Sequence, residues 1–335
     1  MMTKTEPAAG MPEKGSAHDP TAYARVRDRH MLGIEGMTRP ELESLLDRAG
    51  QFADLPPSTR LTHLAGITVF TLFFENSTRT KVSFDVAVRR IGGVVVSVPL
   101  NTSSIKKGES LMDTAATLNA MHPDILVMRH ANAGACQLLS RHVSAAIING
   151  GDGRHEHPTQ ALLDALTIRR RLGYIAGAKI AICGDIANSR VARSNIHLLT
   201  TLGAQIRLVS PPTLMPSGIS QLGVSCHHDL ESGIIGADII MLLRLQSERM
   251  SGTETPSRRE FFQLFGLDEE KRARLAPDAL IMHPGPMNRG VEISSDLADD
   301  YDHSLITQQV ENGVMVRMAC LEALAAHIRQ QREMI

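Results

Sequence analysis

Three hydroxyl groups and a guanidinium are concentrated in one short run, Ser77-Thr78-Arg79-Thr80. The run follows an apolar stretch, residues 67–74, that is typical of a buried strand, and it opens a predicted helix over residues 78–90. A helix N-terminus presents free backbone N–H groups and the positive end of the helix dipole, and it therefore attracts anions. The cap alone favours an ordinary helix start with a solvated Arg79. Its position at the carboxyl end of a parallel strand instead favours a cradle for one phosphate.

Three more arginines follow predicted strands. Arg129 comes directly after the strand 125–128, where it either faces the same crevice or forms a surface ion pair. Arg190 opens a helix after Gly184, and it is placed to bind a carboxylate. The strand, glycine and helix around Gly184 superficially suggest dinucleotide binding, but the GxGxxG fingerprint is absent. Arg244 lies just past a further strand, two residues before Gln246.

A glycine-rich segment leads to His157 and Gln160, which bracket the first turn of a helix that starts at Pro158. A histidine at a helix N-terminus tends to stay neutral, because the dipole disfavours the imidazolium. A neutral imidazole can donate a hydrogen bond to a carbonyl oxygen that gains charge. The alternative is a metal site at His155-Glu156-His157, but the two histidines are not spaced as in a helical HExxH site. We therefore expect no metal.

Two loops complete the candidate groups. The polar loop 101–110 contains Ser103 and Lys107, and on its own it is more typical of a solvated loop than of a lid that delivers Ser and Lys to an anion. The sequence His283-Pro-Gly285-Pro286 predicts a rigid turn after a strand, whose main-chain groups can meet a small ligand.

Alternating strands and helices must position these groups. Strands are predicted at residues 67–74, 93–98, 125–128, 145–149, 179–183, 205–209, 238–243 and 280–282. Helices are predicted from Thr38 and over residues 78–90, 111–121, 159–171, 191–202 and 304–328. Such alternation indicates parallel sheets with right-handed crossovers. The fold class is therefore α/β, with two doubly wound parallel-sheet domains and the active site between them.

Composition restricts the partners. The 335 residues suggest about two domains, and 35 basic against 36 acidic residues leave no bulk field for nucleic acid or a membrane surface. Aromatic residues are 3% and Trp is absent, so base-stacking platforms are not expected. The four cysteines form no CxxC pair, and no apolar run reaches the ~20 residues of a membrane span. We expect a cytoplasmic protein with a disordered extension over residues 1–22.

The motifs Ser77-Thr-Arg-Thr80, His157-Pro-Thr-Gln160, Arg244-Leu-Gln246 and His283-Pro-Gly-Pro286, in this order and spacing, closely resemble the aspartate/ornithine carbamoyltransferase family. The resemblance covers nearly all of residues 30–330. Ornithine enzymes of the family usually carry a His-Cys-Leu-Pro turn and lack a lysine-bearing loop like residues 103–107. The resemblance is therefore stronger to the members that use aspartate.

The resemblance implies a division of labour between two domains. Residues 23–157 and 304–335 would bind carbamoyl phosphate, and residues 158–303 would bind L-aspartate. The implied ligands of the donor are Ser77, Thr78, Arg79, Thr80, Arg129, His157, Gln160, Gly285 and Pro286, with Arg79, Thr80, Arg129 and His157 as catalytic residues. Those of aspartate are Lys107, Arg190, Arg244 and Gln246. Ser103 and Lys107 would come from the neighbouring subunit of a homotrimer.

The implied reaction transfers the carbamoyl group to the amine of L-aspartate and releases phosphate, a step of de novo pyrimidine biosynthesis that needs no cofactor. Orientation and electrostatic stabilisation would supply most of the rate. Related chains act alone or with regulatory or dihydroorotase-like partners. Three alternatives remain: an NAD-dependent oxidoreductase, a catalytically silent binding protein of this fold, and a family member that uses ornithine.

Overall fold

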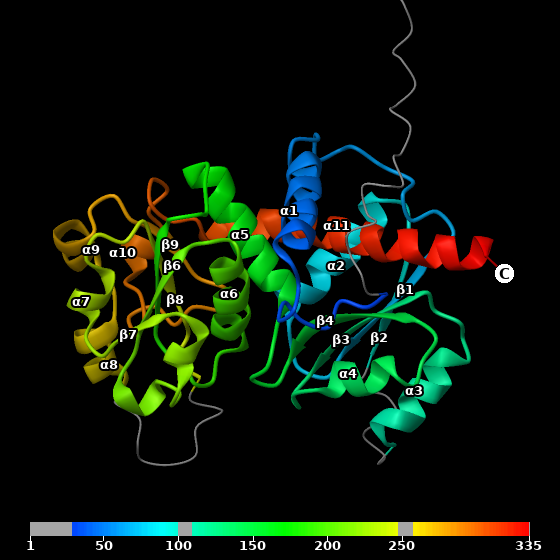
Figure 1. Ribbon diagram of the computed structural model, residues 1–335, viewed down its shortest axis with the longest axis horizontal. Helices are drawn as coiled ribbons and strands as arrows, with labels where there is room; N and C mark the ends of the chain where they lie inside the picture. Colours follow the sequence, from blue (N-terminus) through cyan, green and yellow to red (C-terminus); the bar gives the residue numbers. More distant parts are fainter. Residues whose placement is uncertain (1–28, 100–108, 247–256, 335) are drawn as a thin grey trace, which may run out of the picture.

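The computed structural model describes residues 29–99, 109–246 and 257–334. The extension 1–22 and the residues Ser103 and Lys107 lie outside the described residues. Two lobes, each built on a parallel sheet with helices on its faces, lie side by side along the long axis of the molecule (Figure 1). This architecture confirms the predicted fold class of two α/β domains.

The first sheet has the strand order β2-β1-β3-β4. Its strands are β1 (Thr68–Phe73), β2 (Val94–Val98), β3 (Ile125–His130) and β4 (Ala146–Asp152), and the helices between them are α2 (Thr78–Arg90), α3 (Leu111–Asn119) and α4 (Ala135–Ser140). The central strands are apolar and buried because helices cover both of their faces. Phe73 pairs with Arg129, so the loop after β1 begins beside the second-last residue of β3.

The second sheet has the order β7-β6-β5-β8-β9. Its strands are β5 (Lys179–Cys183), β6 (Gln205–Val209), β7 (Ser225–His227), β8 (Ile239–Leu242) and β9 (Leu280–Met282). Its helices are α6 (Arg190–Thr201), α7 (Leu230–Ile234), α8 (Arg258–Phe265), α9 (Glu269–Leu275) and α10 (Ser295–Ala298), with short 3₁₀ turns at Pro212–Leu214 and Ile219–Leu222. The carboxyl ends of β5 and β8 deliver the segments that hold Arg190 and Arg244.

Three helices join the lobes. They are α1 (Arg39–Ala53), α5 (Pro158–Leu172) and the long α11 (Ile306–Glu333), which packs on α1, α2 and α5 and runs across both lobes in Figure 1. Because it lies between other elements, α5 is buried on every side from Pro158 to Ile168, including its charged residue Asp164. The same apolar cluster reaches from α1 through α5 to α11. The groups on these helices are therefore held by a continuous core.

Most predicted elements are present, with shifted ends. The strand expected at 145–149 continues to Asp152, which bridges to Glu156, and the last helix is displaced from 304–328 to Ile306–Glu333. Thr38 opens α1 as expected, and its N–H and hydroxyl both donate to Glu41. The short helices α4 and α7 to α10 and the strand β7 were not predicted, since three to eight residues carry too little periodicity.

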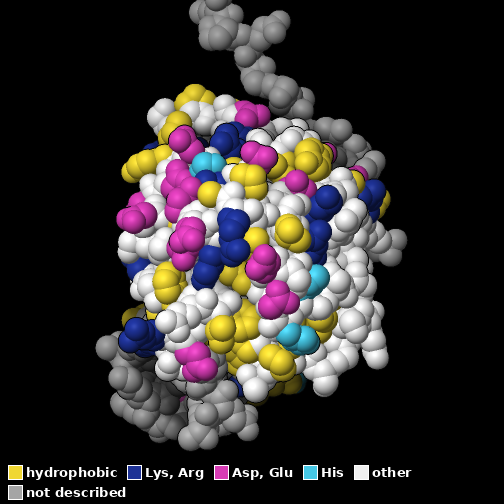
Figure 2. Space-filling view, turned by 90° about the vertical axis from the view of Figure 1, so that its left-hand side faces the viewer, with side chains coloured by type: hydrophobic (Ala, Val, Ile, Leu, Met, Phe, Trp, Pro, Cys, Tyr) yellow, Lys and Arg dark blue, Asp and Glu magenta, His cyan; other side chains and the backbone are white. Residues whose placement is uncertain are grey.

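The outer surface matches the near-zero net charge. Figure 2 shows basic and acidic side chains interspersed over the end of the molecule formed by the second lobe, with scattered apolar side chains between them. Among the described residues, no helix has both the length and the apolar character needed to cross a membrane.

Candidate active site

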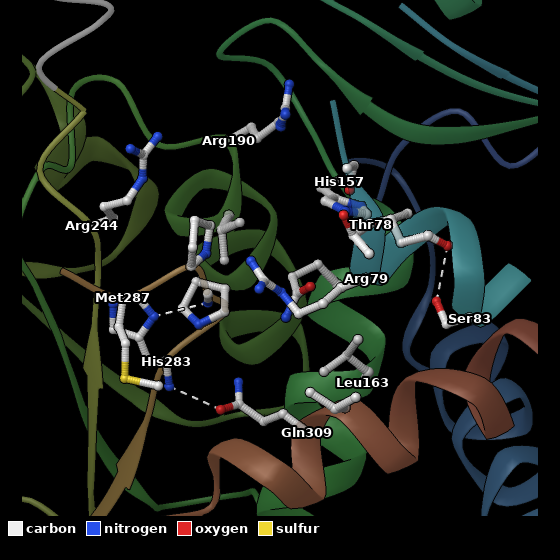
Figure 3. A pocket seen from close by; sticks show the side chains of 18 of the residues that line it. Thr78, Arg79, Ser83, His157, Leu163, Arg190, Arg244, His283, Met287 and Gln309 are labelled. Carbon is white, nitrogen blue, oxygen red and sulfur yellow. Dashed lines mark hydrogen bonds between the residues drawn. The ribbon is translucent and has the colours of Figure 1, made fainter. Parts of the chain in front are cut away.

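A cleft of about 530 Å³ opens between the lobes at the carboxyl ends of the strands. Figure 3 shows Arg79 between His157 and the turn at His283, with Arg190 and Arg244 on the far side of the cleft from Gln309. The residues predicted from sequence that line it are Ser77, Thr78, Arg79, Thr80, Arg129, His157, Gln160, Arg190, Arg244, Gln246, Gly285 and Pro286. Segments as far apart in the chain as Ser77 and Pro286 thus meet at one site.

The start of α2 forms one wall of the cleft. Ser77 is the N-cap residue of α2, but its hydroxyl makes no capping hydrogen bond, so it adds a polar group beside the free N–H groups of the first turn. Thr80 is buried one turn into the helix. Partial burial lowers the pKa of Arg79, but a guanidinium remains charged because its ordinary pKa lies far above neutrality. These groups create a positive, donor-rich concavity suited to a phosphate.

The turn after β9 supports Arg79 from the other side. The Gly285 N–H donates to His283 Nδ1 at 2.8 Å, and His283 Nε2 lies 3.1 Å from Glu292 Oε1, which fixes the imidazole that shapes the turn. Gly285 has a positive φ of 64°, and a Cβ at this position would lie 2.8 Å from Arg79 Cζ. Glycine is required because it lets the backbone adopt this angle and touch the guanidinium.

His157 is buried at the N-cap of α5, and its backbone N–H donates to Ser194 Oγ at 2.8 Å. Its pKa is lowered well below 6.5, first by burial and then by the positive charges of Arg129, Arg190 and Arg317. The side-chain Nδ1 has no hydrogen-bond partner among the described residues. The ring is therefore neutral near pH 7, and it can donate to an oxygen that gains negative charge.

Glu75 is a site residue that sequence reasoning missed. Its Oε2 accepts a hydrogen bond from Arg190 NH2 at 2.6 Å and another from Arg129 Nε at 3.2 Å. Glu75 and Arg129 belong to the first lobe and Arg190 to the second, so one carboxylate oxygen joins the two lobes through two arginines that line the cleft. The available signal was its place in the loop after β1, two residues before Ser77.

The second lobe lines the opposite wall of the cleft with Arg190, Arg244 and Gln246. Arg190 NH1 donates to the Gly153 carbonyl at 3.1 Å, and Gly151, with φ of 115°, leaves room for the guanidinium because a Cβ there would lie 2.9 Å from Arg190 Nε. Gln246 Nε2 donates to the Asn188 carbonyl at 3.0 Å, which fixes the side chain at the cleft edge beside Arg244. Two guanidiniums on this wall can hold two carboxylates of one small ligand.

The other possible ligands of the His155-Glu156-His157 run lie outside the cleft. His155 and Glu156 form a group with Glu35, with ligand atoms within 4.8 Å of one another, whereas His157 faces the cleft instead. The buried Glu156 carboxylate accepts hydrogen bonds from the Ile34 N–H and from Ser194 Oγ, each at 2.8 Å. Its contacts therefore tie the segment before α1 to α6.

Comparison with known proteins places these features in a family. A model described as "Aspartate/ornithine carbamoyltransferase, carbamoyl-P binding domain" matches residues 29–170, and one described as "Aspartate/ornithine carbamoyltransferase, Asp/Orn binding domain" matches residues 176–324. The chain is 59% identical over 308 residues to the aspartate carbamoyltransferase catalytic subunit of Rhodospirillum rubrum, covering 91% of this chain and 97% of that protein. It is 56% identical over 324 residues to the subunit of that name from Caulobacter vibrioides, covering 93% and 98%.

Solved structures of aspartate transcarbamoylase from Trypanosoma cruzi share the fold. The complex with carbamoyl phosphate has a TM-score of 0.79 at 31% identity, covering 88% of this chain and 95% of that one. The complex with N-(phosphonacetyl)-L-aspartic acid has a TM-score of 0.77 at 32% identity, covering 88% and 94%.

Proposed function

The chain belongs to the aspartate/ornithine carbamoyltransferase family, and we propose that its cleft transfers the carbamoyl group of carbamoyl phosphate to the amine of L-aspartate. The products are N-carbamoyl-L-aspartate, which de novo pyrimidine biosynthesis consumes, and phosphate. One observation carries the proposal: the α2 cradle of the first lobe faces Arg190 and Arg244 of the second lobe across the neutral His157.

On the donor side, Ser77, Thr78, Arg79 and Thr80 hold the phosphate. Arg129 reaches the phosphate and carbonyl oxygens, while His157 and Thr80 polarise the carbonyl oxygen. Gln160 and the carbonyls of Gly285 and Pro286 accept hydrogen bonds from the carbamoyl NH2. The lowered pKa of His157 supports this role, because a neutral ring stabilises an oxyanion without first giving up a proton.

On the acceptor side, Arg190 and Arg244 clamp the two carboxylates of aspartate, and Gln246 lies nearby. Lys107, which lies outside the described residues, would join them from a neighbouring subunit. The aspartate amine attacks the carbamoyl carbon, the carbonyl oxygen becomes an oxyanion, and the bond to the phosphate oxygen breaks. Phosphate leaves with that electron pair and takes the proton that the amine loses. Holding both anions in one cleft converts a bimolecular reaction into an oriented one.

A donor and acceptor assay tests the function. Purified protein with carbamoyl phosphate should form product with L-aspartate and none with ornithine, because two guanidiniums match two carboxylates and would repel the δ-ammonium of ornithine. Product formation only with ornithine would contradict the aspartate assignment. No product with either amine would favour a silent binding protein instead.

The two lobes divide the substrates. We assign residues 23–157 and 304–335 to carbamoyl phosphate and residues 158–303 to aspartate. The C-terminal helix α11 packs on α1 and α2, which supports assigning residues 304–335 to the first domain. In this assignment the closing of one domain on the other brings the two substrates together.

A homotrimer that shares its active sites is the assembly we propose, with a cytoplasmic location. Four exposed valines on the contacting elements α2 and β2 support it: Val82, Val86, Val94 and Val96. β2 is an edge strand of the first sheet, and Ser103 and Lys107 follow it in the sequence. Exposed apolar edges of this kind are usually covered by another chain. Larger assemblies with regulatory or dihydroorotase-like chains are compatible with a trimer.

Mixing two inactive variants tests the shared site. Lys107→Ala and Arg79→Ala are each expected to be nearly inactive. In a cyclic trimer that pairs Arg79 of one subunit with Lys107 of the next, every mixed ring regains one intact site. Random reassembly should then restore about a quarter of all sites. Activity that stays at the parental level after verified subunit exchange would contradict the shared site.

A further inference from the structure

A buried carboxylate stands behind the cleft wall and does not line the cleft. Asp164 lies one turn after Gln160 on α5 and is fully buried. Its Oδ1 accepts hydrogen bonds from Gln160 Nε2 at 2.9 Å and from Gln309 Nε2 at 2.7 Å, and its Oδ2 accepts one from Asn195 Nδ2 at 2.8 Å. Three helices, α5, α11 and α6, thus aim an amide NH2 at one residue.

We infer that Asp164 is a positioning residue that sets the polarity of the pocket for the donor's amino group, so that the site selects a donor with NH2 beside its carbonyl. The inference rests on the proposed function, in which Gln160 accepts a hydrogen bond from the carbamoyl NH2. Asp164 acts through Gln160 and Gln309, and it touches no substrate.

The chemistry of a carboxylate fixes which way each glutamine points. An ionised carboxylate only accepts hydrogen bonds, so each glutamine must turn its NH2 toward Asp164 and its oxygen away. Gln309 Oε1 accordingly accepts from the His283 N–H at 2.9 Å, the bond drawn in Figure 3. Gln160 lines the cleft, and its Oε1 has no hydrogen-bond partner among the described residues. Gln160 therefore presents its carbonyl oxygen, an acceptor, to the cleft. Without Asp164 the same side chain could rotate and present its NH2, a donor, instead.

The same carboxylate also fixes the turn after β9. The bond from His283 to Gln309 anchors the first residue of the turn whose later carbonyls, at Gly285 and Pro286, face the donor in the proposed complex. The three acceptors proposed for the donor's NH2 therefore depend on Asp164 through two amides.

Asp164 is ionised near neutral pH despite its burial. Desolvation raises its pKa to about 6, while the hydrogen bonds from Asn195, Gln309 and Gln160 and the charge of Arg317 act in the opposite direction. The carboxylate form that orients both glutamines is thus the form present during turnover at pH 7 and above.

Comparison of two donors tests the inference. Acetyl phosphate keeps the phosphate and the carbonyl of carbamoyl phosphate but carries a methyl group in place of NH2. The measured quantity is the preference, the inhibition constant of acetyl phosphate divided by the dissociation constant of carbamoyl phosphate. The methyl group of acetyl phosphate cannot donate to the acceptors that face the NH2 of carbamoyl phosphate. The wild type should therefore prefer carbamoyl phosphate by at least about tenfold, which is what leaving one buried polar group without a partner costs.

Asp164→Leu removes the carboxylate and frees both glutamines to rotate. The preference should fall about tenfold, whereas the inhibition constant of inorganic phosphate should change less than about threefold, because the α2 cradle is untouched. A folded Asp164→Leu that keeps its preference would overturn the inference. Equal weakening of all three ligands would also overturn it, because Asp164 would then have only a structural role.

A gentler pair of variants decides the matter even if Asp164→Leu does not fold. In Asp164→Asn the NH2 of the new amide faces another NH2 in either orientation: those of Gln160 and Gln309 on one side, or that of Asn195 on the other. Asn195 cannot turn its own NH2 away without losing its bond to the Val191 carbonyl at 3.1 Å. The preference should fall. Adding Asn195→Asp gives the new NH2 an acceptor, turns its oxygen back toward Gln160 and Gln309, and should restore the preference.

The outcomes separate the inference from the function. Equal preference in Asp164→Asn and in the double variant Asp164→Asn with Asn195→Asp would overturn the positioning role, and so would a wild type that binds both donors alike. A wild type that prefers carbamoyl phosphate, with the preference lost and regained as described, yet forms no N-carbamoyl-L-aspartate, would overturn the proposed function alone.

Discussion

The two halves of the cleft differ at one arginine each, Arg79 and Arg190, because only Arg190 already has an anionic partner among the described residues. In the donor half, Arg79 makes no side-chain hydrogen bond among the described residues and rests against Gly285. In the acceptor half, Arg190 is held by Glu75 at 2.6 Å and by the Gly153 carbonyl at 3.1 Å. Arg79 is exposed to the cleft and is ready to meet an anion, whereas the buried Arg190 already has a carboxylate partner in Glu75.

Arg129 joins the halves, because it borders the donor cradle and shares the Glu75 carboxylate with Arg190. This arrangement suggests that the halves fill in sequence. An incoming phosphate first meets Arg79, which has no side-chain hydrogen bond among the described residues, whereas an incoming aspartate must share Arg190 with Glu75. Four experiments test this difference between the two halves, from the largest expected effect to the smallest.

Arg129→Ala should have the largest effect, since it removes a cation used by both halves. We expect turnover to fall by more than about a hundredfold, because losing one transition-state charge contact costs about 3 kcal/mol. Steady-state rates with a thermal melt measure it, and Arg60→Ala is the control, because Arg60 is exposed and, within the described part of the chain, its guanidinium bonds only main-chain carbonyls of the three residues before it. Near-normal turnover in a folded Arg129→Ala would remove Arg129 from the site.

Gly285→Ala should damage the donor half alone. The new Cβ would lie 2.8 Å from Arg79 Cζ and push the guanidinium away from the cradle. Misplacing a catalytic group by about 1 Å can lower a rate about a hundredfold. We expect the displaced Arg79 to weaken phosphate binding somewhat less, with a rise of about thirtyfold in the inhibition constant of phosphate. Gly290→Ala is the matched control, because Gly290 also has a positive φ, of 77°, but no atom within 4 Å of its Cβ position. Similar inhibition constants for the two variants would show that backbone strain, not contact with Arg79, is responsible.

Glu75→Ala should damage the acceptor half. Arg190 loses the carboxylate that orients it, and an arginine has donors enough to bond Glu75 and a substrate together. We expect KM for aspartate to rise about tenfold, the value of one charge-assisted hydrogen bond, with a smaller change in KM for carbamoyl phosphate. Asp47→Ala, which removes an exposed carboxylate paired with Arg169 outside the cleft, is the control. A lower KM for aspartate would mean that Glu75 blocks the acceptor site.

The two halves also differed in how far the sequence could predict them. The donor cradle is contiguous from Ser77 to Thr80, so a single motif after an apolar strand predicted it. Glu75 bonds Arg190, 115 positions away, and Asp164 bonds Gln309, 145 positions away. A lone acidic residue in a loop or helix has no pattern that names such a partner. The contacts arise only when β1, α5, α6 and α11 are packed together, which is a property of the tertiary fold.

The smallest expected effect concerns His157, which should not titrate during the reaction. Its pKa is lowered well below 6.5 by burial and by three arginines, so NMR spectra of labelled imidazoles should show no titration of this ring near pH 6.5, and turnover should show no step from it there. The folded pKa lies below the unfolded one, so the unfolded chain binds more protons on acidification. The stabilisation is complete above pH 6.5 and is lost as the pH falls below that value, with a slope of up to about 1.4 kcal/mol per pH unit. His157→Asn should therefore lose less stability than the wild type between pH 7 and 5.5 in denaturant titrations. Parallel stability curves for the two proteins would show that the pKa of His157 is not lowered by folding and that the donor half tolerates a charged imidazole.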